Sequence, residues 1–294
     1  MEIEARARIG GGQDGAVFGG LLFRFDAAGR CRVYRMDALA GAGDPGREVK
    51  PVGGFALDRR ELLCPHSNAV SFGVPDGEAF PPLYTNVYTT YRAEADRRKG
   101  VCAVYRLRRT AEGFTSALCQ VLRVGFTEDP ALWHSSPRRD DVRPYGNFLA
   151  DPARGLLHVF TMRDADRTTR YFTFRLPEPG AGKVSARYGV PEVVLEEGDI
   201  LRQFDCPYHH FLQGACLHGG LIYSVEGFTG DPENPPALRI IDPEAGRQVF
   251  FEEFRPCGRC EEAELIDFWE GDCWYSDVTG PVYRIRVGGG DAKM

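Results

Sequence analysis

The chain has 294 residues, of which 43% are hydrophobic and 27% are charged, and its formal net charge is −6. This composition is that of a globular protein with enough apolar residues for a core, and the negative charge argues against a general nucleic-acid-binding protein, which usually carries a basic face. No stretch approaches the roughly 18 apolar residues needed to cross a membrane, and the charged first residues lack the apolar segment of a signal peptide. We therefore expect a cytoplasmic protein with no membrane or nucleic-acid partner.

Nine cysteines are present, an odd number in a chain too long to depend on disulfide bonds. Several lie inside apolar runs, where a thiol behaves as a small hydrophobic group, so reduced thiols are expected. Cys257 and Cys260 have the CxxC spacing of half a zinc site, but the sequence holds no second CxxC and no HxxxH pair to complete it. A structural zinc is therefore not expected.

In chain order, the predicted elements are almost all short β-strands separated by Gly, Pro and Asp turns. An alternating segment at residues 2–9 is the first of them. Pairs of strands follow at 21–25 and 31–36, at 156–161 and 170–175, and at 221–225 and 237–241, and a last strand lies at 281–287. No long stretch has the 3.6-residue apolar period of a helix, so an all-β fold is predicted.

An internal repeat organises these strands. Residues 13–23 align without a gap with residues 213–223, and three more segments show the same order of polar residue, short apolar strand, turn and second strand. The five units begin at or near Gln13, Asn68, Asn147, Gln213 and Glu264. Each unit is a small sheet that cannot cover its own faces, whereas radial stacking buries them. We predict a single domain, residues 1–294, folded as a five-bladed β-propeller; a six-bladed propeller and a pair of β-sandwiches are the alternatives.

The two ends of the chain predict how the ring closes. The last unit stops one strand short after residues 281–287, and the strand at residues 2–9 belongs to no unit. Pairing these two strands would complete the last blade and remove an exposed edge. Such closure resembles that used throughout the β-propeller superfamily, and the resemblance covers nearly the whole chain.

The polar residues that begin the units predict a site. In a propeller the first strand of each blade lines the central axis, so these side chains should converge there as a ring of four amides and one carboxylate, Glu264. One interpretation is that they bond to neighbouring backbone and water. The other is a ligand or ion site, because amide oxygens with a carboxylate suit a hard cation such as calcium. Arg143 or Arg259 could instead neutralise Glu264.

Histidine and tyrosine side chains lie near two of the predicted strand entrances. The segments Cys64-Pro65-His66 and Cys206-Pro207-Tyr208-His209-His210 are alike, and each leads into an axial strand. The candidate catalytic residues are His66, His209 and Glu264. The candidate ligand-binding residues are Gln13, Asn68, Tyr145, Asn147, Tyr208, His210 and Gln213.

Three functions are compatible with such a site. The first hypothesis is a binding module that holds a carbohydrate or another small polar ligand at the mouth of the axial channel. The second is a sugar-active enzyme: a lyase would use His66 or His209 as its base, and a hydrolase needs two carboxyls, for which Glu264 with Glu226 or Glu262 are available. The third is a protein-interaction scaffold that uses the rim.

The ring also resembles the sites of two propeller families. Gluconolactonase-like propellers hold a metal with axial Glu, Asn and Asp side chains, and Glu264, Asn68 and Asn147 are similar in kind. That family has six blades, and a clear fourth acidic ligand is missing here. Five-bladed furanosidases place three acidic residues in the ring, where this chain offers mainly amides.

Overall fold

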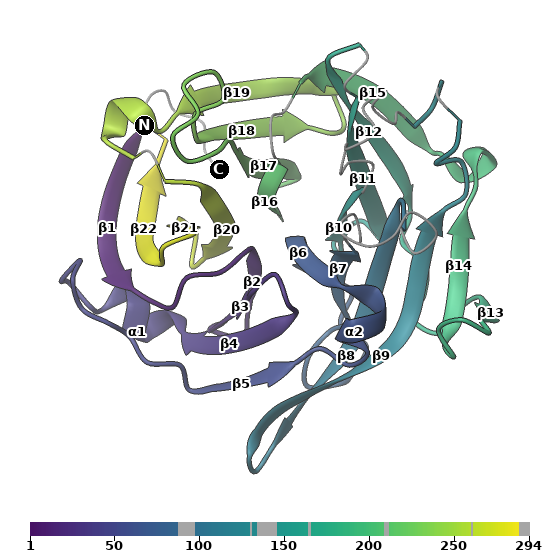
Figure 1. The fold of residues 1–294 in the computed structure, drawn as a ribbon, viewed down its shortest axis with the longest axis horizontal. Helices are drawn as coiled ribbons and strands as arrows, with labels where there is room; N and C mark the ends of the chain where they lie inside the picture. The colour runs from purple at the N-terminus through teal and green to yellow at the C-terminus, as the bar shows by residue number, and fades with distance from the viewer. Residues whose placement is uncertain are drawn as a thin grey trace.

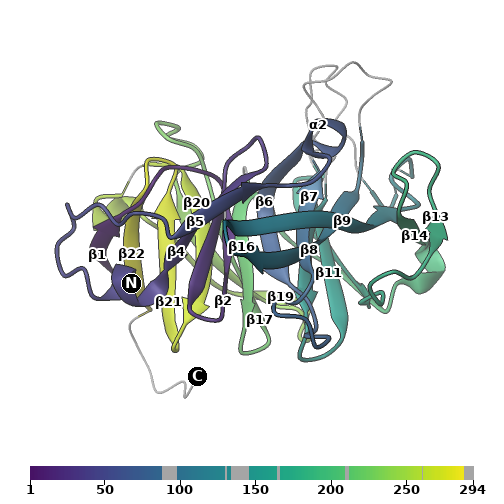
Figure 2. The same ribbon diagram turned by 90° about the horizontal axis from the view of Figure 1, so that it is seen from below.

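The computed structural model of this protein describes residues 1–87, 98–129, 131–133, 146–163, 166–208, 212–259 and 261–287. Its strands form five sheets, which Figure 1 shows as blades around a central axis. Seen from the side, the blades make a disc (Figure 2). The fold is therefore the five-bladed β-propeller that the internal repeat predicts, and not a six-bladed ring or a pair of sandwiches.

Four blades have four strands each, and one has six. From the axis outward, the first blade holds β2 (Gly15–Phe18), β3 (Leu21–Phe25), β4 (Arg30–Arg35) and β5 (Gly53–Ala56). The second holds β6 (Pro65–Phe72), β7 (Leu83–Val87), β8 (Val101–Thr110), β9 (Gly113–Val124), β14 (Pro191–Leu195) and β13 (Lys183–Val184). The third holds β10 (Asn147–Asp151), β11 (Leu156–Arg163), β12 (Thr168–Arg175) and β15 (Arg202–Pro207). The fourth holds β16 (Leu212–His218), β17 (Leu221–Glu226), β18 (Ala237–Asp242) and β19 (Arg247–Glu253). The fifth holds β20 (Ala263–Trp269), β21 (Asp272–Asp277), β22 (Pro281–Arg286) and β1 (Glu2–Arg8).

The apolar core is divided among the blade interfaces. Successive strand residues point to opposite faces of a sheet, so Phe23 packs toward the second blade while its neighbour Leu22 packs toward the fifth. The same alternation separates Leu83 from Tyr84 in β7. Five buried clusters result, one at each interface between neighbouring blades. Because both faces of every blade are covered in this way, the ring holds together without a separate core.

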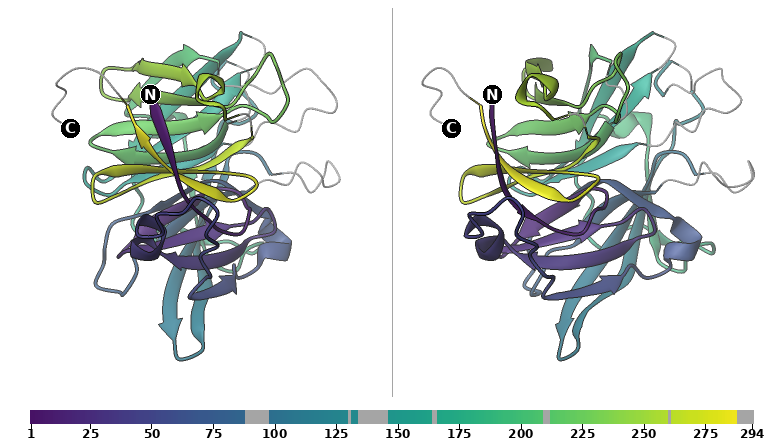
Figure 3. Two further views of the ribbon diagram at one scale, coloured as in Figure 1. Left: turned by 90° about the vertical axis from the view of Figure 1, so that its left-hand side faces the viewer. Right: turned by 60° about the vertical axis from the view of Figure 1, so that its left-hand side comes forward.

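The ring closes through the N-terminal strand, as predicted. In β1, Ile3 stands opposite Ile285 of β22, and the Arg284 guanidinium donates to the Glu4 carboxylate over 2.6 Å. Figure 3 shows the purple β1 running beside the yellow strands of the last blade. Residues from the two ends of the chain thus form one sheet.

The outer strands β13 and β14 were not predicted. They come from the segment between β12 and β15 of the third blade, yet β14 pairs in parallel with β9 of the second. The connection therefore extends the neighbouring blade, which gives that blade its six strands.

Helices are few and short. The α-helices are α1 (Met36–Ala40) and α2 (Arg60–Leu63), and single 3₁₀ turns lie at Glu197–Asp199 and Arg255–Cys257. Within the described ranges, no helix has the length and apolar character needed to span a membrane. The eight cysteines for which the structure gives a position are all free thiols, in agreement with the prediction.

Candidate functional site

The five polar residues predicted to form a ring lie at or near the start of the five inner strands; they are called the axial cluster below. Gln13 comes just before β2, Asn147 is the first residue of β10, and the other three lie within β6, β16 and β20. The short helix α2, which leads into β6, marks this face of the disc in Figure 2.

Three inner strands are irregular at the residue they contribute. The register with the next strand shifts around Asn68 in β6, at Gln213 in β16 and at Glu264 in β20. An extra residue in one strand stays out of the ladder and re-aims its side chain, and such bulges are frequent beside functional sites. Ser67, buried beside Asn68, has a left-handed φ of 62°, a conformation that costs on the order of 1 kcal/mol for a residue with a side chain. These distortions weaken the ladders and turn polar side chains toward the axis.

Hydrogen bonds join three members of the axial cluster. The Asn68 amide donates to Gln213 Oε1 over 2.8 Å and to the Leu212 carbonyl over 3.2 Å. The backbone N–H of Asn68 donates to Asn86 Oδ1 over 2.9 Å, and the Asn86 amide donates to Asn147 Oδ1 over 3.3 Å. Asn86, which the sequence did not single out, therefore connects the second and third blades.

The other two members, Gln13 and Glu264, form a second group. The Gln13 amide donates to Glu264 Oε1 over 3.0 Å. The Gln213 amide donates to the carboxylate of Glu262, which lies just before β20, two residues before Glu264. Glu262 and Gln13 are partly exposed, whereas Glu264 and Gln213 are buried. A ligand in solvent can therefore reach Glu262, which lies beside the axial cluster, and Gln13, which belongs to it.

The two carboxyl groups both hold their protons unusually tightly. Burial, assisted by the nearby charge of Glu262, raises the pKa of Glu264 well above its ordinary value. Burial alone raises the pKa of Glu262 to about 7. Burial therefore favours the protonated form of the deeper carboxyl, while the outer one is near half-ionisation at neutral pH.

Among the described residues, Arg24 of β3 is the cation whose charge acts on Glu264. Its side chain is buried and donates to the carbonyls of Gly12 and Asp277 over 2.7 and 3.0 Å. Burial lowers the pKa of Arg24, and the charge of Glu264 is the strongest influence in the opposite direction. The sequence-based alternative of Arg259 is wrong, because that guanidinium lies over the Tyr283 ring, 4.5 Å from its centroid.

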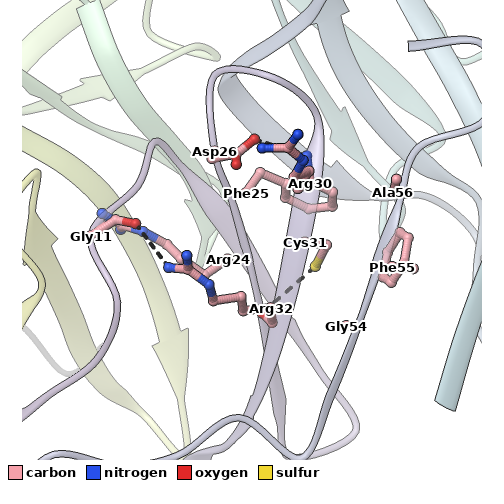
Figure 4. Close-up of a pocket in the computed structure, with 10 residues that line it drawn as sticks. All are labelled: Gly11, Arg24, Phe25, Asp26, Arg30, Cys31, Arg32, Gly54, Phe55 and Ala56. Carbon is pink, nitrogen blue, oxygen red and sulfur yellow. Dashed lines mark hydrogen bonds between the residues drawn. The ribbon is translucent and has the colours of Figure 1, made fainter.

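Figure 4 shows that Arg24 also lines a pocket of about 350 Å³ on the first blade, with Arg30, Arg32 and Gly11 among its neighbours. Arg32 donates to the Gly11 carbonyl over 3.4 Å. A side chain at Gly11 would meet the Val278 carbonyl oxygen at 2.3 Å. Glycine is therefore required at position 11 by close packing.

Asp14 is the main residue that the sequence reasoning missed. It is fully buried, and its Oδ2 accepts backbone N–H groups of Val70 and Ala215 over 3.0 and 3.3 Å. One carboxyl thus ties the first blade to the second and the fourth, and burial raises its pKa well above the ordinary value. A signal was present, because Asp14 aligns with Gly214 in the repeat, and a Cβ on Gly214 would lie 2.9 Å from Asp14 Oδ1.

The entrance residues are placed only in part. His66 is partly buried, and burial lowers its pKa to about 4, so its imidazole is neutral at neutral pH. Tyr208 has the Arg167 guanidinium over its ring, 4.4 Å from the centroid, which occupies one of its stacking faces. His209, His210, Tyr145 and Arg143 lie outside the described residues.

Three further predictions concern a second catalytic carboxyl, a metal ion and the CxxC pair. Glu226 is not available as a second catalytic carboxyl, because the buried Arg239 guanidinium donates to both of its oxygens over 2.6 and 2.9 Å. In the part of the chain that is described, no group of three His, Cys, Asp or Glu side chains could hold a metal ion. Cys257 is partly buried beside the Met1 carbonyl, and Cys260 lies outside the described residues.

Comparisons with known proteins add little to this geometry. No protein-family model matches the sequence, and no curated protein matches it. Among solved structures, the chain is similar to BamB from Moraxella catarrhalis, with 11% identity, a TM-score of 0.36, and coverage of 96% of this chain and 60% of that one. It is also similar to an exo-β-1,3-galactanase from Phanerochaete chrysosporium bound to β-1,3-galactotriose, with 10% identity, a TM-score of 0.49, and coverage of 97% and 64%. An engineered GH43 glycoside hydrolase matches at 14% identity with a TM-score of 0.39, over 70% of this chain and 35% of that one.

The chain thus spans less than two thirds of the length of these structures. At TM-scores below 0.5 the similarities carry no argument about activity. The assignment as a five-bladed β-propeller rests on the strand order and pairing of this chain itself.

Proposed function

We propose that the end of the propeller axis marked by the axial cluster binds a small, uncharged, hydroxyl-rich ligand, such as a monosaccharide or a short oligosaccharide. The observation that carries the proposal is the coincidence of backbone irregularity with polar side chains. Three of the five inner strands leave their ladder at Asn68, Gln213 and Glu264. If these positions had only a structural role, regular strands with apolar side chains would fill the axis at a lower cost in free energy.

The chemistry of the cluster suits hydroxyl groups. Amides offer both donors and acceptors, as does a protonated carboxyl, and a sugar hydroxyl both donates and accepts. The raised pKa of Glu264 favours its protonated form, which can donate as well as accept. Gln13 and Glu262 are partly exposed to solvent, whereas Glu264 is buried beneath them. Such a mixed polar site favours a neutral polar ligand over a divalent ion, which needs several ionised or carbonyl oxygens.

A sugar-active enzyme is the second candidate, and the unequal environments of the two carboxyls favour it specifically. Glycoside hydrolysis needs one protonated and one ionised carboxyl. Burial favours the protonated form of Glu264, whereas Glu262, with a pKa of about 7, is partly ionised at neutral pH. The sequence hypothesis of a lyase base is less favoured, since a histidine of pKa about 4 such as His66 is a weak base.

The test is calorimetric titration of the protein with a panel of neutral mono- and oligosaccharides. The variant Glu262→Gln removes the accessible carboxyl but keeps its shape, and Glu112→Gln changes an exposed carboxyl in the turn between β8 and β9 as a control. We expect Glu262→Gln to weaken binding by about tenfold, the cost of one hydrogen bond to a charged group, and the control to bind like wild type. Equal affinities in all three proteins, or no binding across the panel, would overturn the proposal. Release of reducing sugar by wild type and not by Glu262→Gln would establish the enzyme.

A further inference from the structure

A second pocket lies on the axis at the opposite end of the inner strands. It has a volume of about 230 Å³ and is lined by residues from all five blades, among them Val17, Phe18, Phe72, Cys216 and Asp267. Val17 follows Gln13 by four positions in the chain, which at about 3.3 Å per strand residue separates them by about 13 Å. The pocket is therefore distinct from the axial cluster and does not depend on the function proposed for it.

Asp267 of β20 is held rigidly in this pocket. Its Oδ2 accepts the backbone N–H of Val17 from the first blade over 2.5 Å, and its Oδ1 accepts the N–H of Phe268 over 2.7 Å. No cation among the described residues forms an ion pair with it. Burial raises its pKa to about 7, and only these two N–H bonds act in the opposite direction.

A carboxylate without a countercharge is costly to keep away from water, and a bound cation removes that cost. The fixed orientation means that the carboxylate does not need to reorganise when a ligand arrives. Asp267 is the only ionisable carboxyl among the residues that line the pocket.

The lining also includes two aromatic rings. Phe18 and Phe72 lie with their ring centroids 5.2 Å apart, and both are partly exposed. Aromatic faces attract organic cations. The polar groups nearby are already used or weak: Ser71 Oγ accepts the Ala150 N–H over 2.9 Å, and Cys216 is a buried thiol. A metal ion, which needs several oxygen ligands, has no coordination sphere here.

We infer that this pocket binds a small alkylammonium ion, with the Asp267 carboxylate paired to the ammonium group and the Phe18 and Phe72 rings packed against its alkyl part. The volume of about 230 Å³ is below the roughly 300–1,000 Å³ of pockets for drug-sized ligands. The ligand is therefore a small amine and not a large heterocycle.

The probe is n-butylammonium, with 1-butanol as a neutral molecule of the same shape. Titration of wild type is compared with Asp267→Asn and with Glu270→Gln, an exposed carboxyl in the turn between β20 and β21 at the same end of the disc. We expect wild type and Glu270→Gln to bind butylammonium alike, Asp267→Asn to bind it about tenfold or more weakly, and none of the three to bind butanol measurably.

Because Asp267 accepts two backbone N–H groups, Asp267→Asn also changes the stability of the fold, so a wild-type measurement is added. The carboxyl ¹³C shift of Asp267 is followed against pH, with and without butylammonium. The cation should lower the apparent pKa of that carboxyl from about 7, because it stabilises the ionised form. An unchanged titration curve, or equal binding of butylammonium and butanol, would overturn the inference.

Discussion

The Gln13 amide donates a hydrogen bond to the Glu264 carboxyl over 3.0 Å, although 251 positions separate the two residues in the chain. The bond joins the first blade to the last at the axis, a few residues along the chain from β1, which completes the ring at the outer edge of the fifth blade. The axial cluster and the closure of the propeller are therefore linked, and a change that opens the ring should also disturb the cluster.

Removal of residues 1–9 tests the closure. The deletion exposes the edge of β22 and removes the buried Ala7 and Ile9, so we expect a loss of several kcal/mol in the free energy of unfolding or a failure to fold. The point variant Ile9→Ala should cost about 2–5 kcal/mol, while Arg8→Ala, at an exposed position, should cost little. Thermal and urea unfolding measure these changes. A truncated protein that melts like the full chain would show that the ring does not depend on β1.

A substitution at Gly214 tests how closely the inner strands β16 and β20 pack at the axis. An added Cβ would lie 2.4 Å from the Glu264 carbonyl oxygen, which cannot move without shifting β20. We expect Gly214→Ala to destabilise the fold by about 1–3 kcal/mol and to weaken the binding of any ligand at the axial cluster. Gly198→Ala is the matched control, because a Cβ there would meet nothing within 4 Å. Equal melting temperatures for the two variants would contradict the close contact.

The repeat and the strand alternation predict most of the fold because they are local signals. The pattern that sends Phe23 and Leu22 to opposite interfaces can be read from a few residues, and the missing last strand follows from counting units. The pairing of β14 with the neighbouring blade has no such signal, because it depends on where a long connection comes to rest.

The candidate site could be predicted only in part for the same reason. The positions of the five polar residues follow from the repeat, but their partners do not. Arg24 lies in a second strand, Asn86 in another blade, and Asp14 supports N–H groups of two different blades. Contacts of this kind depend on the three-dimensional placement of the blades, which a single sequence does not reveal.

The raised pKa of Glu262 predicts a dependence of stability on pH. Its folded value of about 7 exceeds the ordinary 4.5, so between these values the folded protein holds a proton that the unfolded chain has lost. The contribution of this group to the free energy of unfolding should therefore be largest below about pH 4.5 and decline as the pH rises to about 7. Urea unfolding across this range should show a flatter profile for Glu262→Gln than for wild type or Glu112→Gln. Parallel profiles in all three proteins would contradict the assigned environment.

The last prediction concerns Glu264, which positions the Gln13 amide from beneath. Because burial favours the protonated form of this carboxyl, Glu264→Gln replaces it with a neutral group of the same shape, and we expect a melting temperature close to that of wild type. The variant loses the acidic proton, so binding of a neutral sugar should weaken by up to about tenfold. Calcium should give no heat with either protein, because neutral amides and one partly ionised carboxyl, Glu262, are too few charged ligands for it. Calorimetric titration of both proteins with calcium and with the sugar panel separates the cases. Calcium binding by wild type that disappears in Glu264→Gln would replace the ligand site with an ion site. If wild type binds neither and the variant is equally stable, Glu264 is a structural residue, and the functional interpretation of the axial cluster fails.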